Sequence, residues 1–217
     1  MLTMEELEIK EKEIAEKIKA IPSINGCFPV IDGIIDIERY INAKYKILWI
    51  LKEANFGKSK GSWDMLAYYR EAKESDINKS LTTRRVMLVS HRFFPDVTPL
   101  SAFQSIAYIN IKKVAGYENS DDTEIEKAFS AHKCLLLEQI ETYNPDIIIC
   151  GNTLNYFEND LDFRKGESIS IGMEQRHYFC SKERLYINAF HPAYPKITDE
   201  EYSDKIFNAF SYWVSKK

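Results

Sequence analysis

Four short apolar runs, separated by segments with helical periodicity, constrain the fold of this chain more than any other feature of its sequence. Each run is short enough for a single strand and apolar at nearly every position, which is typical of strands buried on both faces. The runs are YKILWILK at 45–52, SIAYINI at 105–111, DIIIC at 146–150 and RLYINAF at 184–190. They predict a mainly parallel, four-stranded central sheet in an α/β protein.

The segments between these runs carry helical patterns, and three of them begin with the spacing of a capping box. The three pairs are Thr3/Glu6 before a helix expected at 4–20, Thr123/Glu126 before a long helix that Pro145 closes, and Thr198/Glu201 before a final helix. Weaker patterns favour helices at about 63–73 and 81–90. Helices that alternate with buried strands cover both faces of a sheet, so we expect a three-layer α/β/α sandwich.

The size and composition of the chain fit one soluble domain. At 217 residues, with 45% apolar and 29% charged residues, it is long enough to bury a core without disulfides or a metal. We therefore predict a single domain over 1–217, with 1–44 as a helical extension packed on it. The N-terminus is highly charged and no long apolar run follows it, so we expect a cytoplasmic protein without a membrane segment. We also expect the protein to be a monomer.

Several classes of site are disfavoured by what the sequence lacks. The four cysteines form no CxxC pair, which argues for reduced thiols and against a metal site. Cys150 ends an apolar strand, where thiols are mostly inert. Neither GxxxxGK[ST] nor GxGxxG occurs, so no phosphate-cradling loop is expected. The net charge of −4 opposes general coating of nucleic acid but is compatible with a local basic groove.

Polar residues occur where each predicted strand ends. Glu53 follows the first run, Asn110 lies at the end of the second, Asn152 follows the third and His191 follows the fourth. Each residue alone has a structural explanation, such as a helix cap or a strand-end hydrogen bond. Because ligands of parallel α/β sheets bind beyond the carboxyl ends of the strands, their joint placement predicts a site there.

Three of these stretches, in order, resemble the motifs of the uracil-DNA glycosylase superfamily. WILKEANFG is similar to a strand followed by a GQDPY or GEAPG loop, AYINIKKVAG to a strand ending in a base-reading Asn, and NAFHPAYP to an HPS-type loop with the catalytic His. CLLLEQIETYNPDIIICGN resembles a segment of the iron–sulfur branch. The resemblance spans about 45–195 and implies hydrolysis of the N-glycosidic bond of uracil or another deaminated base in DNA.

The resemblance also implies roles for individual residues. Glu53 would steady the cationic sugar or orient water, and His191 would donate a hydrogen bond to the departing base. A flipped base would be read or stacked by the substrate-binding residues Asn110, Phe56, Asn55 and Asn152. The DNA backbone would be met by Lys58, Lys60, Lys112 and Lys113.

The chain departs from the family pattern in three places. In KEANFG, Lys52 and Asn55 stand where GEAPG has glycine and proline. Cys134 matches one cluster cysteine, but Val114 replaces another and the N-terminal CxxC is missing, so we expect no iron–sulfur cluster and no other cofactor. HPAYP lacks the serine of the family's loop, and Tyr194 either replaces the wedge into DNA or packs on the last helix.

Two other functions are compatible with the same sequence, so whether the protein is an enzyme stays open. One is a relative that binds a nucleotide, base or nucleic acid without cutting it, with Lys52 holding Glu53 in a structural pair. The other is a doubly wound interaction module that uses some of its thirteen tyrosines, such as Tyr68, Tyr69 and Tyr156, as surface contacts.

Overall fold

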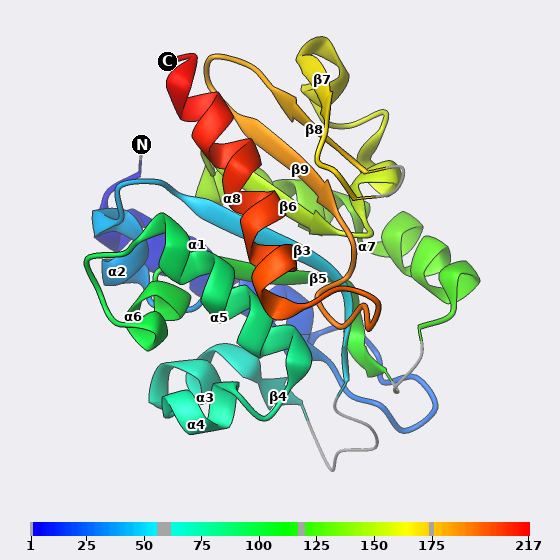
Figure 1. Ribbon diagram of the computed structural model, residues 1–217. Helices are drawn as coiled ribbons and strands as arrows, with labels where there is room; N and C mark the ends of the chain where they lie inside the picture. Colours follow the sequence, from blue (N-terminus) through cyan, green and yellow to red (C-terminus); the bar gives the residue numbers. More distant parts are fainter. Residues whose placement is uncertain (1, 56–61, 117–119, 174–175) are drawn as a thin grey trace.

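The computed structural model describes residues 2–55, 62–116, 120–173 and 176–217, and its centre is a seven-stranded mixed sheet (Figure 1). The strand order across the sheet is β2-β5-β3-β6-β9-β8-β7. The strands are β2 (Gly33–Ile34), β3 (Ile47–Asn55), β5 (Ala107–Gly116), β6 (Ile147–Gly151), β7 (Glu167–Ser170), β8 (His177–Cys180) and β9 (Leu185–Ala189). A separate pair of parallel strands consists of β1 (Val30–Ile31) and β4 (Trp63–Asp64).

The four predicted strands form the parallel centre of this sheet. β3 pairs in parallel with β5 and β6, and β6 pairs in parallel with β9. The expectation of only four strands is wrong, because β2, β8 and β7 extend the sheet with antiparallel pairs. β2 has two residues and β7 is largely exposed, so neither produces the apolar run that reveals a buried strand.

The helices occupy the intervals between the strands. They are α1 (Met4–Lys19), α2 (Ile37–Asn42), α3 (Met65–Glu71), α4 (Glu74–Ile77), α5 (Leu81–Phe93), α6 (Pro99–Gln104), α7 (Asp122–Tyr143) and α8 (Asp199–Ser215), with short 3₁₀ turns at Leu154–Phe157 and Asp162–Lys165. The capping box of α1 is confirmed, and the Thr198 hydroxyl caps α8. No helix of the described ranges has the length and apolar composition needed to span a bilayer.

One predicted helix start is wrong by a short distance. α7 is capped by Asp121 and not by Thr123, because the Asp121 carboxylate accepts hydrogen bonds from the backbone N–H groups of Thr123 (2.8 Å) and Glu124 (3.1 Å). A carboxylate at this position satisfies free N–H groups of the first turn and also matches the helix dipole.

Helices lie on both sides of the sheet in Figure 1, with α5 and α8 in front and α7 behind it. α1 packs along α7, and Lys17 and Glu138 join the two helices by an ion pair of 2.5 Å. The segment 1–44, expected to be helical, also supplies β1 and β2, and β2 is an edge strand of the main sheet. The residues of 47–51 are buried almost completely, so the core lies along the central strand β3.

The pairing of β3 with β5 becomes irregular at the carboxyl end. Glu53 lies opposite Lys112, but Asn55, two residues later, lies opposite Gly116, four residues later. The two extra residues on β5 form a bulge, which bends a strand and redirects its side chains. The predicted KEANFG loop therefore begins within β3, at a distorted corner of the sheet.

Candidate functional site

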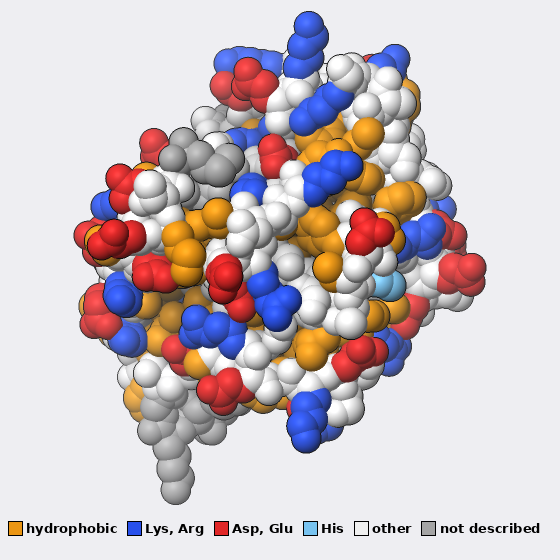
Figure 2. Space-filling view, turned by 90° about the vertical axis from the view of Figure 1, so that its left-hand side faces the viewer, with side chains coloured by type: hydrophobic (Ala, Val, Ile, Leu, Met, Phe, Trp, Pro, Cys, Tyr) orange, Lys and Arg blue, Asp and Glu red, His pale blue; other side chains and the backbone are white. Residues whose placement is uncertain are grey.

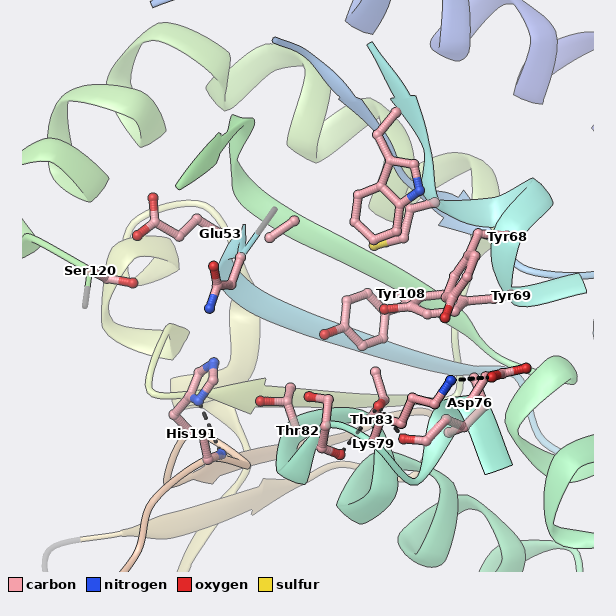
Figure 3. Close-up of a pocket in the computed structure, with 17 residues that line it drawn as sticks. Glu53, Tyr68, Tyr69, Asp76, Lys79, Thr82, Thr83, Tyr108, Ser120 and His191 are labelled. Carbon is pink, nitrogen blue, oxygen red and sulfur yellow. Dashed lines mark hydrogen bonds and ion pairs between the residues drawn. The ribbon is translucent and has the colours of Figure 1, made fainter. Parts of the chain in front are cut away.

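A pocket of about 500 Å³ opens beyond the carboxyl ends of β3 and β9 (Figure 3). Glu53 and Asn55 from the end of β3 line it together with His191, which follows β9. The opposite wall is built by α3, α4 and the start of α5. Three of the predicted site residues therefore meet in one cavity, at the end of the sheet where the polar pattern predicted a site.

His191 is held in one protonation state by its own loop. The backbone N–H of Ala193 donates to His191 Nδ1 at 3.1 Å, so Nδ1 must accept and the proton of the neutral ring is on Nε2. Burial, together with the charge of Lys52, lowers the pKa of His191 from 6.5 to about 4. At neutral pH His191 is thus an uncharged ring with an N–H donor at the pocket.

Arg85 of α5 holds the HPAYP loop, and no sequence motif singled it out. Its guanidinium is almost fully buried and donates to the backbone carbonyls of Pro192 (2.8 Å), Tyr194 (2.7 Å) and Ile197. It also pairs with the Asp199 carboxylate at 2.7 Å. These bonds fix the backbone just after His191, because they satisfy carbonyls that would otherwise be buried without donors.

The remaining contacts of this loop are aromatic. Tyr194 stacks on Phe190 with ring centroids 4.2 Å apart, and the Tyr202 hydroxyl of α8 donates to the Phe190 carbonyl at 2.8 Å. Tyr194 therefore packs within its own loop, against Phe190. The two prolines noted in the sequence act together with Arg85 and Tyr202 to hold the loop in place.

Glu53 is paired with Lys112 of β5 and not with its neighbour Lys52. Its side chain is only 5% exposed, and Lys112 Nζ lies 2.9 Å from Glu53 Oε2, although the angles at this contact fall outside hydrogen-bond geometry. A Cβ at Gly116 would overlap the Glu53 carboxylate, so the glycine makes room for it. In Figure 3 this carboxylate points away from Tyr108. Lys52 pairs instead with Asp122, at 2.5 Å.

Asn110 is buried beneath the pocket and does not line it. It is 1% exposed, and neither its side-chain nitrogen nor its oxygen has a hydrogen-bond partner in the described part of the chain. Because side chains alternate along a strand, Asn110 lies on the same face of β5 as Tyr108, which does line the pocket. The amide predicted to read a base is thus next to the cavity, with its bonding capacity unused.

Asn152 lies outside the pocket lining. It follows β6 in a left-handed conformation (φ 63°), which asparagine tolerates better than most residues. Its side-chain oxygen accepts a hydrogen bond from Arg176 at 2.6 Å. In place of the predicted contact with substrate, the Asn152 side chain joins the turn after β6 to Arg176, just before β8.

Of the predicted DNA-binding lysines, the two that the structure describes are both held by acidic partners within the protein. Lys113 is fully buried and its ammonium contacts Asp32 and Gln139, each at 2.7 Å, which corrects the expectation that it reaches a DNA backbone. Lys112 is held between Glu53 and Glu124. Phe56, Lys58 and Lys60 lie outside the described residues. On the face seen in Figure 2, acidic and basic side chains are interspersed.

Aromatic rings line the side of the pocket away from His191. Trp63, Tyr68, Tyr69 and Tyr108 all contribute, with ring centroids 5.6 to 6.4 Å apart between the neighbouring pairs. Figure 3 shows Tyr108 between His191 and the pair Tyr68 and Tyr69. The sequence suggested Tyr68 and Tyr69 as surface contacts, which is wrong for Tyr69, since it is buried against the neighbouring rings. Tyr108 lies within a predicted strand, and the apolar run gave no sign that it would face a pocket.

In the described part of the chain, neither a metal-binding cluster nor a cysteine lines the pocket. No three His, Cys, Asp or Glu side chains within the described ranges are grouped so as to hold a metal ion. Burial raises the pKa of the Cys150 thiol to about 12, which keeps it protonated and inert as predicted.

Comparisons with known proteins do not assign the chain to a family. It matches no protein-family model, and no curated protein is similar enough to count as a match.

Proposed function

We propose that the protein hydrolyses the N-glycosidic bond of a nucleobase, with the scissile bond between His191 and the end of β3. The observation that carries this proposal is the state of His191: a neutral ring, its tautomer set by Ala193, with an N–H donor at a pocket that aromatic rings also line. The parallel centre of the mixed sheet, β5-β3-β6-β9, agrees with the mainly parallel sheet expected from the resemblance to uracil-DNA glycosylases.

His191 suits the leaving group of this reaction. As the bond between base and sugar breaks, negative charge grows on an oxygen of the base, and a fixed donor there stabilises the transition state more than the ground state. A neutral imidazole needs no carboxylate beside it for this task. Removal of one such donor typically lowers kcat by about 10²–10³.

The end of β3 suits the other side of the bond. Asn55 lines the pocket and offers an amide that can hold a water molecule, and Glu53 supplies a carboxylate that can steady the oxocarbenium-like sugar. Asn110 has a donor and an acceptor suited to the edge of a base, and its buried side chain must turn toward the cavity to reach one.

A second candidate is a relative that binds a base or nucleoside without cutting it. The ion pair of Glu53 with Lys112 favours this candidate, because it neutralises the carboxylate and turns it from the centre of the pocket. Glu53→Gln separates the two. Both functions keep binding in this variant, whereas only an enzyme loses turnover.

The test is release of free base from substrates with uracil, hypoxanthine or xanthine, followed by chromatography. We expect wild-type protein to release one of these bases, and His191→Ala to lower kcat by about 10²-fold or more. His177→Ala is the matched control, since His177 is exposed on β8 and outside the pocket lining. Equal rates in the wild type and His191→Ala would remove His191 from the mechanism. No release by folded protein would leave the binding candidate.

A further inference from the structure

The charges around the pocket are unusual for a site that meets a nucleic-acid backbone. Its described lining has two carboxylates, Glu53 and Asp76, against one ammonium, Lys79, while His191 is neutral. Glu53 and Asp76 are each paired with a lysine, so the described lining has little net charge. Proteins that hold DNA neutralise several phosphates with lysine and arginine, and the described lining offers for this purpose only one cation, which is already paired.

The described lysines on or near the lining are already paired with carboxylates. Lys79 pairs with Asp76 at 2.7 Å, and Lys52 pairs with Asp122 at 2.5 Å. Lys112 lies 2.9 Å from both Glu53 and Glu124. A phosphate would have to displace a carboxylate from each of these ammonium groups, which costs about as much attraction as it gains.

The interior of the pocket fits an uncharged molecule with a flat ring and hydroxyl groups. Tyr68 is the exposed ring of the aromatic wall, backed by the buried Tyr69, and an aromatic ring of this kind can stack on a base. Ser80 and Thr82 line the adjacent wall, and the Ser80 side chain makes no capping bond to α5. Neutral hydroxyls of this kind hydrogen-bond to sugar hydroxyls without demanding a charge.

The size of the cavity agrees with a whole small molecule. At about 500 Å³ it falls in the range of pockets that enclose complete ligands, and it extends from His191 past Tyr108 to Tyr68. A single flipped base would occupy only the part next to His191. The aromatic part would then be unused.

We propose that the substrate of this pocket is a free, uncharged nucleoside and not a base within DNA; this inference rests on the proposed hydrolase function. Water attacks C1′ and forms a C1′–O bond, while the C1′–N bond breaks and its electron pair leaves with the base. The attacking water loses one proton to solvent and the departing base takes up one proton, so the step balances. The products are a free base and a pentose.

The experiment compares uridine, 2′-deoxyuridine, inosine and xanthosine with single- and double-stranded oligonucleotides that contain the same bases. We expect kcat/KM for the best nucleoside to exceed that for its oligonucleotide by at least about tenfold. We also expect little change in rate between about 50 and 200 mM salt, where binding to a DNA backbone would fall steeply. Cleavage of oligonucleotides but not of nucleosides would overturn the inference and leave the hydrolase function standing.

If neither kind of substrate is cleaved, the hydrolase function fails and binding decides the inference. Equilibrium dialysis would then measure labelled uridine and inosine with wild type, Tyr68→Ala and the control Tyr212→Ala, whose ring lies on α8 outside the pocket lining. Binding that weakens at least about fivefold in Tyr68→Ala alone would support a nucleoside site. Absence of binding, or equal binding by both variants, would overturn it.

Discussion

Two adjacent lysines on β5 belong to two regions of opposite character. Lys112 lies beside the pocket, where it is shared between the partly exposed Glu124 and Glu53. Lys113, on the other face of the strand, lies in a buried polar cluster, which we define as Asp32, Lys113, Gln139, Tyr143 and Glu11. Within that cluster the ammonium of Lys113 and the carboxylate of Asp32 are both 0% exposed.

Most polar atoms of the buried cluster are hydrogen-bonded within it, with Glu11 Oε1 as an exception. Gln139 accepts from Lys113 at 2.7 Å and donates to Asp32 Oδ1 at 3.1 Å and to the Tyr143 hydroxyl at 3.2 Å. Asp32 also accepts from the backbone N–H of Asn110 at 2.7 Å. These residues come from β5, α7 and the turn between β1 and β2, so the network joins the edge of the sheet to the helix behind it.

The two regions differ in how far their polar groups are occupied. Asn110, beneath the pocket, has hydrogen-bonding atoms without partners in the described part of the chain, and His191 presents a donor at the pocket. In the buried cluster most groups are occupied, and water cannot replace a lost partner. Substitutions in the cluster should therefore cost mainly stability, and those at the pocket mainly activity.

The largest expected effect is the loss of the buried cation. Lys113→Met removes the ammonium and leaves Asp32 as an unpaired buried carboxylate, which should lower the free energy of unfolding by about 3–5 kcal/mol. Urea denaturation followed by circular dichroism measures it. Lys112→Met, the matched control, should cost less than half as much, because solvent and Glu124 are nearby. Equal losses would remove the contrast between the regions.

Arg85 extends the comparison to the loop of the pocket, where we expect an intermediate loss of stability. Arg85→Met leaves the carbonyls of Pro192, Tyr194 and Ile197 without their donor. It should therefore lower the free energy of unfolding by about 2–4 kcal/mol. It should also free His191, whose ring nitrogens report the tautomer in long-range ¹H–¹⁵N spectra. Arg84→Met, which removes an exposed pair with the same Asp199, is the control and should leave that spectrum unchanged.

The smallest net effect is that of pH on the wild-type protein, because the contributions of the two regions oppose one another. Burial, with a smaller contribution from the charge of Asp32, raises the pKa of Glu11 from 4.5 to about 7, against hydrogen bonds from Tyr143 and Ile34 and the charge of Lys113. The folded state then binds more protons between these values, so Glu11 contributes stability below pH 4.5 that is lost as the pH rises toward 7. The pKa of His191 is depressed from 6.5 to about 4, so its contribution is present above pH 6.5 and lost as the pH falls toward 4.

Two variants isolate these opposing terms between pH 4.5 and 6.5. In Glu11→Gln only the contribution of His191 to the pH dependence of stability should remain, so that the free energy of unfolding rises with pH by up to about 3 kcal/mol. His191→Asn should leave the Glu11 term, so that it falls by a similar amount. Denaturation at half-unit steps of pH measures both, and parallel curves for the two variants would contradict the assigned environments.

The sequence was most informative where an apolar run or a capping pair lies within one short segment of the chain. The four central strands and the caps of α1 and α8 follow from apolar runs and from spacing within a single turn. The edge strands were missed because two to four partly exposed residues leave no apolar run. Glu53, Asn55 and His191 could be placed together because parallel strands bring their carboxyl ends to one edge.

The partners of the charged and aromatic side chains could not be predicted in this way. Arg85 meets the HPAYP loop 107 to 112 residues away, and Lys113 meets Asp32 at a separation of 81 residues. No local pattern encodes such contacts, because they depend on how α5, α7 and the sheet pack. The sequence by itself thus determined the strands and the edge at which the site lies, since hydrophobic periodicity is local. Only the tertiary structure decided that Lys112 pairs with Glu53 beside the pocket while Lys113 is buried in the core. The physical reason is that the two residues lie on opposite faces of β5, next to its bulge.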